Sequence, residues 1–129
     1  MSKLFIVVPC YNEEEVLPIS SKVLLDFLKR MIAKNKVSTE SSILFVDDGS
    51  KDKTWAIIKR LSEQEEHFKG LKFSRNFGHQ NALLAGMTTA VQFADMIVTI
   101  DADLQDDVEA IEGMIDAYHD GNDVVYGVR

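Results

Sequence analysis

Short apolar runs alternate with helical patterns along the whole chain, and this alternation is the feature that most constrains the fold. Predicted strands lie at Leu4–Val8, Ile43–Val46, Leu71–Phe73, Met96–Ile100 and Asp123–Gly127. Strands that are apolar on both faces and alternate with helices are typical of a parallel sheet covered on both sides. We therefore expect an α/β fold: a three-layer α/β/α, Rossmann-like, mainly parallel sheet that forms one domain over residues 1–129.

Four helices are predicted between these strands from apolar side chains at helical spacing. The expected helices run over residues 16–32, from Trp55 past Leu61, over residues 81–93 and from Val108 to Tyr118. We expect Pro9 to end the first strand and Asn12 to cap the first helix, with acidic residues in its first turn.

Charge excludes one broad class of function. The chain has 14 basic and 21 acidic residues and a formal net charge of −7, which does not suit a general nucleic-acid binder. No apolar stretch approaches the roughly 20 residues that span a bilayer, so the chain itself is expected to be soluble. The single Cys10 cannot form a disulfide within the chain, and we expect it to pack in the interior.

Ligands of open parallel sheets lie beyond the carboxyl ends of the strands. The segments expected at that edge are Pro9–Glu13, Asp47–Ser50, Ser74–His79, Asp101–Gln105 and Gly127–Arg129. His79 is the one histidine expected there.

Two acidic pairs, Asp47–Asp48 and Asp101-x-Asp103, end two of these predicted strands. Converging carboxylates repel one another unless a cation compensates, and Mg²⁺ or Mn²⁺ with oxygen ligands is the natural one. Acids are also common in turns and at helix starts, so the pattern leaves open a divalent-metal site or ordinary solvated turns. Tyr11 likewise either packs or stacks on a base.

Four motifs resemble those of family 2 inverting glycosyltransferases with the GT-A fold. They are Val8–Glu14 (VPCYNEE), Val46–Thr54 (VDDGSKDKT), Phe73–Gln80 (FSRNFGHQ) and Asp101–Asp106 (DADLQD). The branch that they resemble most is that of polyprenyl-phosphate glycosyltransferases, which includes dolichol-phosphate mannose synthases and bactoprenol glucosyltransferases. The four motifs occur in the family's order and spacing, and the resemblance covers the whole chain.

The resemblance implies roles for particular residues. Those implied to hold the nucleoside are Pro9, Tyr11, Glu13, Val46 and Asp48. Asp101, Ala102 and Asp103 would contact the nucleotide-sugar, and Asp101 and Asp103 are the implied catalytic residues. Asp103 and Gln105 would hold the divalent metal, and Arg129 would bind the acceptor phosphate. The segment 75–80 would lie near the donor sugar, with no individual roles assigned.

The activity implied by the resemblance is metal-assisted, inverting transfer of a hexose from a UDP- or GDP-sugar to a polyprenyl phosphate. It implies a role in cell-wall or glycan biogenesis, at the cytoplasmic side of a membrane-associated parent protein. The chain departs from the family in two places: Asp107-Val108-Glu109 replaces Pro-Pro-Glu, and the chain stops at Arg129. Family catalytic domains continue for roughly another hundred residues. We therefore expect a donor-binding part that is inactive alone and whose apolar surface could form a homo-oligomer.

Two other functions remain open. A receiver-like signalling domain has a similar length and an acidic metal pocket, but the residues that follow the first and third strands here, Pro9–Tyr11 and Ser74–Arg75, are not those such a pocket needs. The chain could also bind a nucleotide-sugar without turnover.

Overall fold

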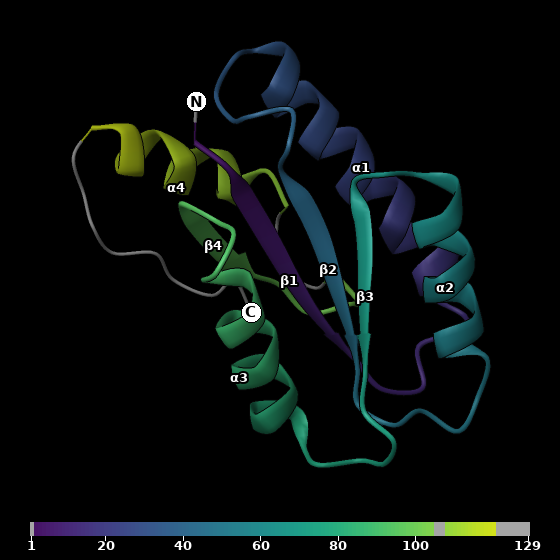
Figure 1. Ribbon diagram of the computed structural model, residues 1–129. Coiled ribbons are helices and arrows are strands. Elements are labelled where there is room, and N and C mark those ends of the chain that lie inside the picture. Colours follow the sequence, from purple (N-terminus) through teal and green to yellow (C-terminus); the bar gives the residue numbers. More distant parts are fainter. Residues whose placement is uncertain (1, 105–107, 121–129) are drawn as a thin grey trace.

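The computed structural model describes residues 2–104 and 108–120 and shows one sheet of four parallel strands among them (Figure 1). The elements, in chain order, are β1 (Leu4–Cys10), α1 (Leu17–Ala33), β2 (Ser42–Asp47), α2 (Thr54–Gln64), β3 (Phe68–Lys72), α3 (His79–Ala90), β4 (Met96–Thr99) and α4 (Ala110–His119). This confirms the predicted α/β class and parallel sheet. The predicted strand over residues 123–127 lies outside the described residues.

The strand order is β3-β2-β1-β4. Successive strands are added on one side of β1 up to β3, and β4 is then added on the other side of β1. Figure 1 shows α1 and α2 on one side of the sheet and α3 on the other. Receiver domains have the order 2-1-3-4-5, in which the first strand lies between the second and the third. Here β1 lies between β2 and β4, which excludes the receiver alternative and places the topological switch point between β1 and β4.

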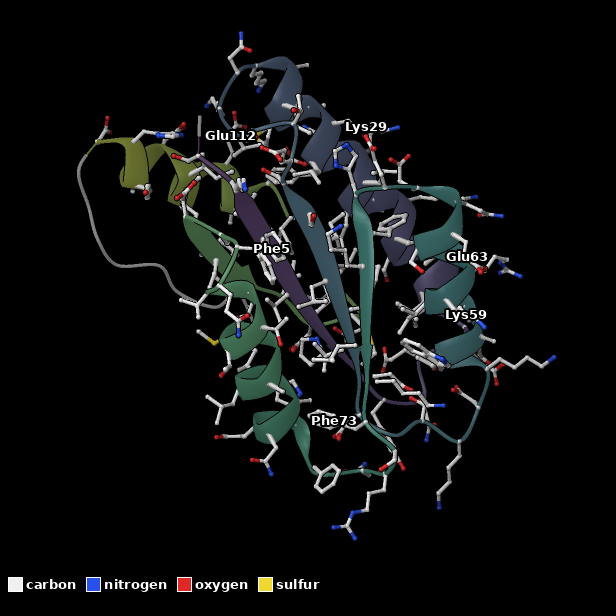
Figure 2. All side chains as sticks on the ribbon, viewed as in Figure 1. Phe5, Lys29, Lys59, Glu63, Phe73 and Glu112 are labelled. Atoms are coloured by element: carbon white, nitrogen blue, oxygen red, sulfur yellow. The ribbon has the colours of Figure 1, made fainter. Side chains whose placement is uncertain are left out.

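The two faces of the sheet are packed differently. On one face a large cluster joins β1 and β2 to α1, α2 and α4, and Phe27, Phe45 and Ile111 are fully buried in it. On the other face Phe5, labelled in Figure 2, and its neighbours pack under α3. Gly86 allows this close packing, because a Cβ there would lie 2.5 Å from Val7 Cγ1.

The expectation that Pro9 ends the first strand is wrong, because β1 continues to Cys10. Pro9 pairs with Val46 of β2. Along a parallel strand the backbone groups face alternate neighbours, and Val7 O accepts from Ile100 N on the β4 side. Pro9, two residues later, faces that same side beyond the end of β4, where its missing N–H is not needed.

The expectation that Asn12 caps the first helix is also wrong. Helix α1 begins at Leu17 with no acidic residue in its first turn, and Asn12 lies four residues before its N-cap, Val16. Asn12 has a left-handed backbone with φ of 52°, and its side-chain Oδ1 accepts a hydrogen bond from Lys51 N at 2.9 Å. A turn residue that binds the next loop therefore occupies the position predicted for a cap.

Candidate functional site

A cavity of about 350 Å³ opens at the carboxyl edge of the sheet, at the switch point between β1 and β4 and beside the start of α3. Its lining residues are Pro9, Cys10, Tyr11, Glu13, Asp48, Asn76, Gly78, His79, Ala82, Asp101, Ala102 and Asp103. All four quoted motifs contribute residues to this lining. Four carboxylates and one imidazole therefore face one small cavity.

Most of the site residues implied by the resemblance meet in this cavity. They are Pro9, Tyr11, Glu13, Asp48, Asp101, Ala102 and Asp103. Val46 does not line it, because its side chain is fully buried beneath α3 and Gly86. Gln105 and Arg129 lie outside the described residues.

The loop after β1 is held by the loop after β2. Asn12 N donates to Ser50 Oγ at 2.8 Å, and Glu13 N donates to Thr54 Oγ1 at 2.8 Å. Glu14 N donates to Asp52 Oδ2 at 3.2 Å. The sequence motif contains Ser50, Asp52 and Thr54, but no role could be assigned to them from the pattern, because the partners are backbone amides some 40 positions away. These side chains fix where Glu13 enters the cavity.

Asp52 shows how strongly this junction is bonded. Burial alone would raise the pKa of its carboxyl, but hydrogen bonds from the Thr54 hydroxyl, Thr54 N and Glu14 N lower the pKa overall. Asp52 is thus held as a carboxylate by the donors around it.

Asp48 holds the loop after β3. Its Oδ1 accepts from Phe77 N at 2.8 Å and its Oδ2 accepts from Gly78 N at 3.1 Å, and its side chain is only 3% exposed. Each carboxylate oxygen has a second lone pair, so these bonds do not prevent a contact with a ligand. Asp48 is therefore a structural anchor as well as a lining residue of the cavity.

Gly49 allows the loop after β2 to lie close to the loop after β3. A Cβ at this position would lie 2.2 Å from Arg75 C and 2.4 Å from Asn76 N, and its φ is +69°. Only glycine fits this combination without strain.

The Asp101–Asp103 segment is a turn and not the extended segment that would place residues i and i+2 on one side. Leu104 N donates to Asp101 O at 3.0 Å, and Leu104 has a left-handed backbone with φ of 51°. Ser20 Oγ on α1 donates to Ala102 O, which anchors the turn from the core side. Both carboxylates nevertheless line the cavity, as expected.

The gathered acids affect one another. Burial raises the pKa of Glu13, and the negative charges of Asp103, Asp52 and Asp101 raise it further. Burial also raises the pKa of the Cys10 thiol well above its usual range, with added contributions from Glu13 and Asp47. Cys10 therefore stays protonated, and it is buried as predicted.

The described residues contain no cluster of three or more His, Cys, Asp or Glu side chains that could hold a metal ion. Mg²⁺, however, is commonly bound by one or two carboxylates together with substrate phosphates and water. The lining carboxylates of Asp101 and Asp103 offer the hard oxygen donors of such a site, so the donor set fits an ion that the ligand helps to coordinate.

Within residues 2–104 and 108–120, no helix combines the length and apolarity required to cross a membrane.

Comparison with known proteins identifies relatives. The family described as "Glycosyl transferase family 2" matches residues 5–129. The chain is 48% identical over 126 residues to the "Uncharacterized glycosyltransferase YkoT" of Bacillus subtilis, covering 98% of this chain and 37% of that protein. It is 40% identical over 127 residues to the "Prophage bactoprenol glucosyl transferase homolog" of Escherichia coli, covering 98% of this chain and 39% of that protein.

Among solved structures, the chain resembles S. aureus TarS in a form spanning residues 1–349. The TM-score is 0.55 at 23% sequence identity, over 91% of this chain and 33% of that one. Identity this low supports the fold alone, and the fold agrees with the GT-A expectation. The chain spans less than two-fifths of the length of the two curated relatives.

Proposed function

Because the chain belongs to glycosyl transferase family 2, we propose that its cavity binds a nucleotide-diphosphate sugar, the donor of a hexosyl transfer. The observation that carries this proposal is the meeting of Tyr11, Glu13, Asp48, Asp101 and Asp103 from separate motifs in one cavity of about 350 Å³. An aromatic ring and carboxylates suit a nucleoside, since the ring can stack on the base and a carboxylate can accept from its ring N–H.

The proposed metal is Mg²⁺ or Mn²⁺, with Asp103 and Gln105 as the residues of this chain that would hold it. When bound, such an ion supplies charge neutralisation for the diphosphate leaving group. Asp101 and Ala102 would contact the nucleotide-sugar beside it. Glu13, whose pKa is raised by burial and its acidic neighbours, belongs to the same region of negative charge that a cation would relieve.

The proposed acceptor is a polyprenyl phosphate, because relatives are named as bactoprenol glucosyl transferases. An acceptor phosphate oxygen would attack the anomeric carbon from the face opposite the leaving group. The new C–O bond forms as the bond to the diphosphate breaks, so the configuration inverts and the nucleoside diphosphate leaves. A phosphate anion needs little help from a base, so the protein's main tasks are in-line positioning and leaving-group stabilisation.

Arg129 is the proposed contact for the acceptor phosphate. In the whole protein the reaction would occur at the cytoplasmic surface of a membrane, where the lipid acceptor resides. The present chain covers the donor side of that reaction, and we propose that it binds the donor without completing transfer by itself.

Thermal unfolding with UDP-glucose or GDP-mannose tests the donor proposal. At least one of these probes should raise Tm in the presence of Mn²⁺ and fail to do so in EDTA. Equal shifts in Mn²⁺ and EDTA would contradict the metal assignment, and no shift with either probe would contradict the donor assignment for these sugars. Asp116→Asn on α4 removes a carboxylate outside the cavity and serves as the matched control.

A further inference from the structure

Acidic side chains outnumber basic ones among the described residues that line the cavity. Among the described residues that line it, the charged or chargeable oxygen groups are Glu13, Asp48, Asp101 and Asp103, and no Lys or Arg is present. His79 is the only described lining residue whose side chain can carry positive charge. A diphosphate that enters among four carboxylates therefore needs every available donor.

His79 lies where a ligand in the cavity would meet it. It is the first residue of α3, its Nε2 is 3.8 Å from Asp101 Oδ1, and both residues line the cavity. The imidazole is 62% exposed, so it is not occupied by packing. An imidazole carries at least one N–H in either protonation state, and it can donate to a phosphate oxygen without any change in its charge.

The backbone before His79 is firmly held. Asp48 accepts from the N–H groups of Phe77 and Gly78, and Asn76 Oδ1 also accepts from Gly78 N, at 2.8 Å. Asn81 Nδ2 donates to Phe77 O at 2.7 Å, which joins the loop to the first turn of α3. The imidazole is thus presented to the cavity by a loop whose amides are anchored on a buried carboxylate, so little ordering is required when a ligand binds.

We infer that His79 is a donor-binding residue that donates a hydrogen bond to the outer phosphate of the nucleoside diphosphate, the phosphate that carries the sugar. This inference rests on the proposed function. The position of His79 next to Asp101 favours a contact with the diphosphate over one with the base, since the resemblance places the base at the segment around Tyr11. The start of α3, where backbone N–H groups point outward, adds to the local attraction for negative charge.

Calorimetric titration in Mn²⁺ tests this inference with UMP, UDP, GMP and GDP as probes. For the base that the wild-type chain binds, His79→Ala should weaken the diphosphate about tenfold or more, as expected for a hydrogen bond to a charged group. The matching monophosphate should change less than twofold. His79→Gln, which retains a side-chain N–H donor, should recover part of the loss.

The control is Leu84→Ala, an exposed residue of α3 outside the cavity lining, which should leave both affinities unchanged. Equal weakening of monophosphate and diphosphate by His79→Ala would overturn the inference and place His79 against the nucleoside side. Unchanged binding of both would overturn it as well. A wild-type chain that binds neither diphosphate would contradict the proposed function itself, which is distinguishable because the failure then precedes any substitution.

Discussion

Two acidic regions of this molecule are treated in opposite ways. On the α1–α4 surface the acids of α4 and of its N-cap face basic residues of α1 and of the turn after it, as in the pairs Arg30–Glu109 at 2.6 Å and Lys36–Asp116 at 2.8 Å. At the carboxyl edge, four carboxylates line one cavity in which the described lining residues include no Lys or Arg. Figure 2 shows Glu112 on the first of these surfaces, at the end of the sheet remote from Phe73.

The pKa directions express the same difference. Hydrogen bonds from Lys36 and Lys34 lower the pKa of Glu112, whereas burial and acidic neighbours raise the pKa of Glu13. The chain thus supplies its own cations where acids serve stability. The described residues that line the cavity include no Lys or Arg beside its acids, so a bound cation would add positive charge there. This distinction argues for a functional rather than a structural role of the edge.

The largest expected effect is on ligand-dependent stability. At a ligand concentration of about 100 times Kd, a bound nucleotide-sugar stabilises the fold by about 2.7 kcal/mol. Asp103→Asn should remove most of the Mn²⁺-dependent part, because it takes away a carboxylate proposed to hold the ion. Thermal unfolding with and without Mn²⁺ measures this, and Asp116→Asn should retain the full effect. If Asp103→Asn kept the Mn²⁺-dependent rise in Tm, the proposal that Asp103 helps to hold the ion would be contradicted.

The next largest effect is expected from a substitution where the loop after β2 meets the loop after β3, with no change of charge. Gly49→Ala should destabilise the fold by about 1–3 kcal/mol, since the new Cβ meets the backbone of Arg75 and Asn76 in a left-handed conformation. Gly113→Ala in α4 is the matched control, with open space around the added methyl group, and should stabilise by about 0.5–1 kcal/mol. Urea unfolding of both variants gives the comparison. A change in the free energy of unfolding of the same sign in both variants would contradict the close approach at Gly49.

A smaller effect follows from the raised pKa of Glu13. A carboxyl whose pKa is raised on folding binds more protons in the folded state, so stability falls as pH rises through the window between the unfolded and the folded pKa. Glu13→Gln should therefore raise the ligand-free Tm at pH 7 by about 1–3 °C. The gain should shrink as the pH falls through the window between the folded and the unfolded pKa, because wild-type Glu13 then becomes protonated as well. A constant gain across this range would show that charge is not its cause.

The smallest expected effect is a fall in Tm, opposite in sign to that of Glu13→Gln, and it concerns the α1–α4 surface. Glu112→Gln removes a carboxylate that Lys34 and Lys36 contact at 3.0 and 2.8 Å. Because the pKa of Glu112 is lowered, its contribution is present above the unfolded pKa and is lost as pH falls through the folded pKa. Tm at pH 7 should fall slightly, and the fall should diminish in high salt, as for exposed pairs in general. A rise in Tm would remove the contrast with Glu13.

The sequence predicted the sheet and most of the cavity because both depend on patterns within short segments. Apolar runs indicated the four described strands, and the residues just after them supplied the carboxylates that meet at one edge. The pattern failed where a residue is used by a distant partner. Asn12 has the side chain of a helix cap but binds the backbone of Lys51, and Pro9 continues β1 because β4 ends before reaching it.

Other features were not predictable from local pattern for a related reason. Asp48 reads as a ligand residue, yet both of its oxygens accept from the loop after β3. Val46 belongs to a quoted motif but is buried under α3. The turn at Leu104, whose backbone is left-handed, contains Ala102, and Ala102 O accepts a hydrogen bond from Ser20 on α1. Spacing alone does not show this long-range contact.

Retention of Mn²⁺ in equilibrium dialysis tests the central claim most directly, namely that the acidic edge accepts a cation together with a nucleoside diphosphate. Alone, the chain should retain little Mn²⁺, because its described residues provide no three-ligand cluster. With UDP or GDP it should retain about one ion per chain with one nucleotide, a positive coupling of the two ligands. Mn²⁺ retention that is equal with and without nucleotide, or absent in both cases, would contradict the account.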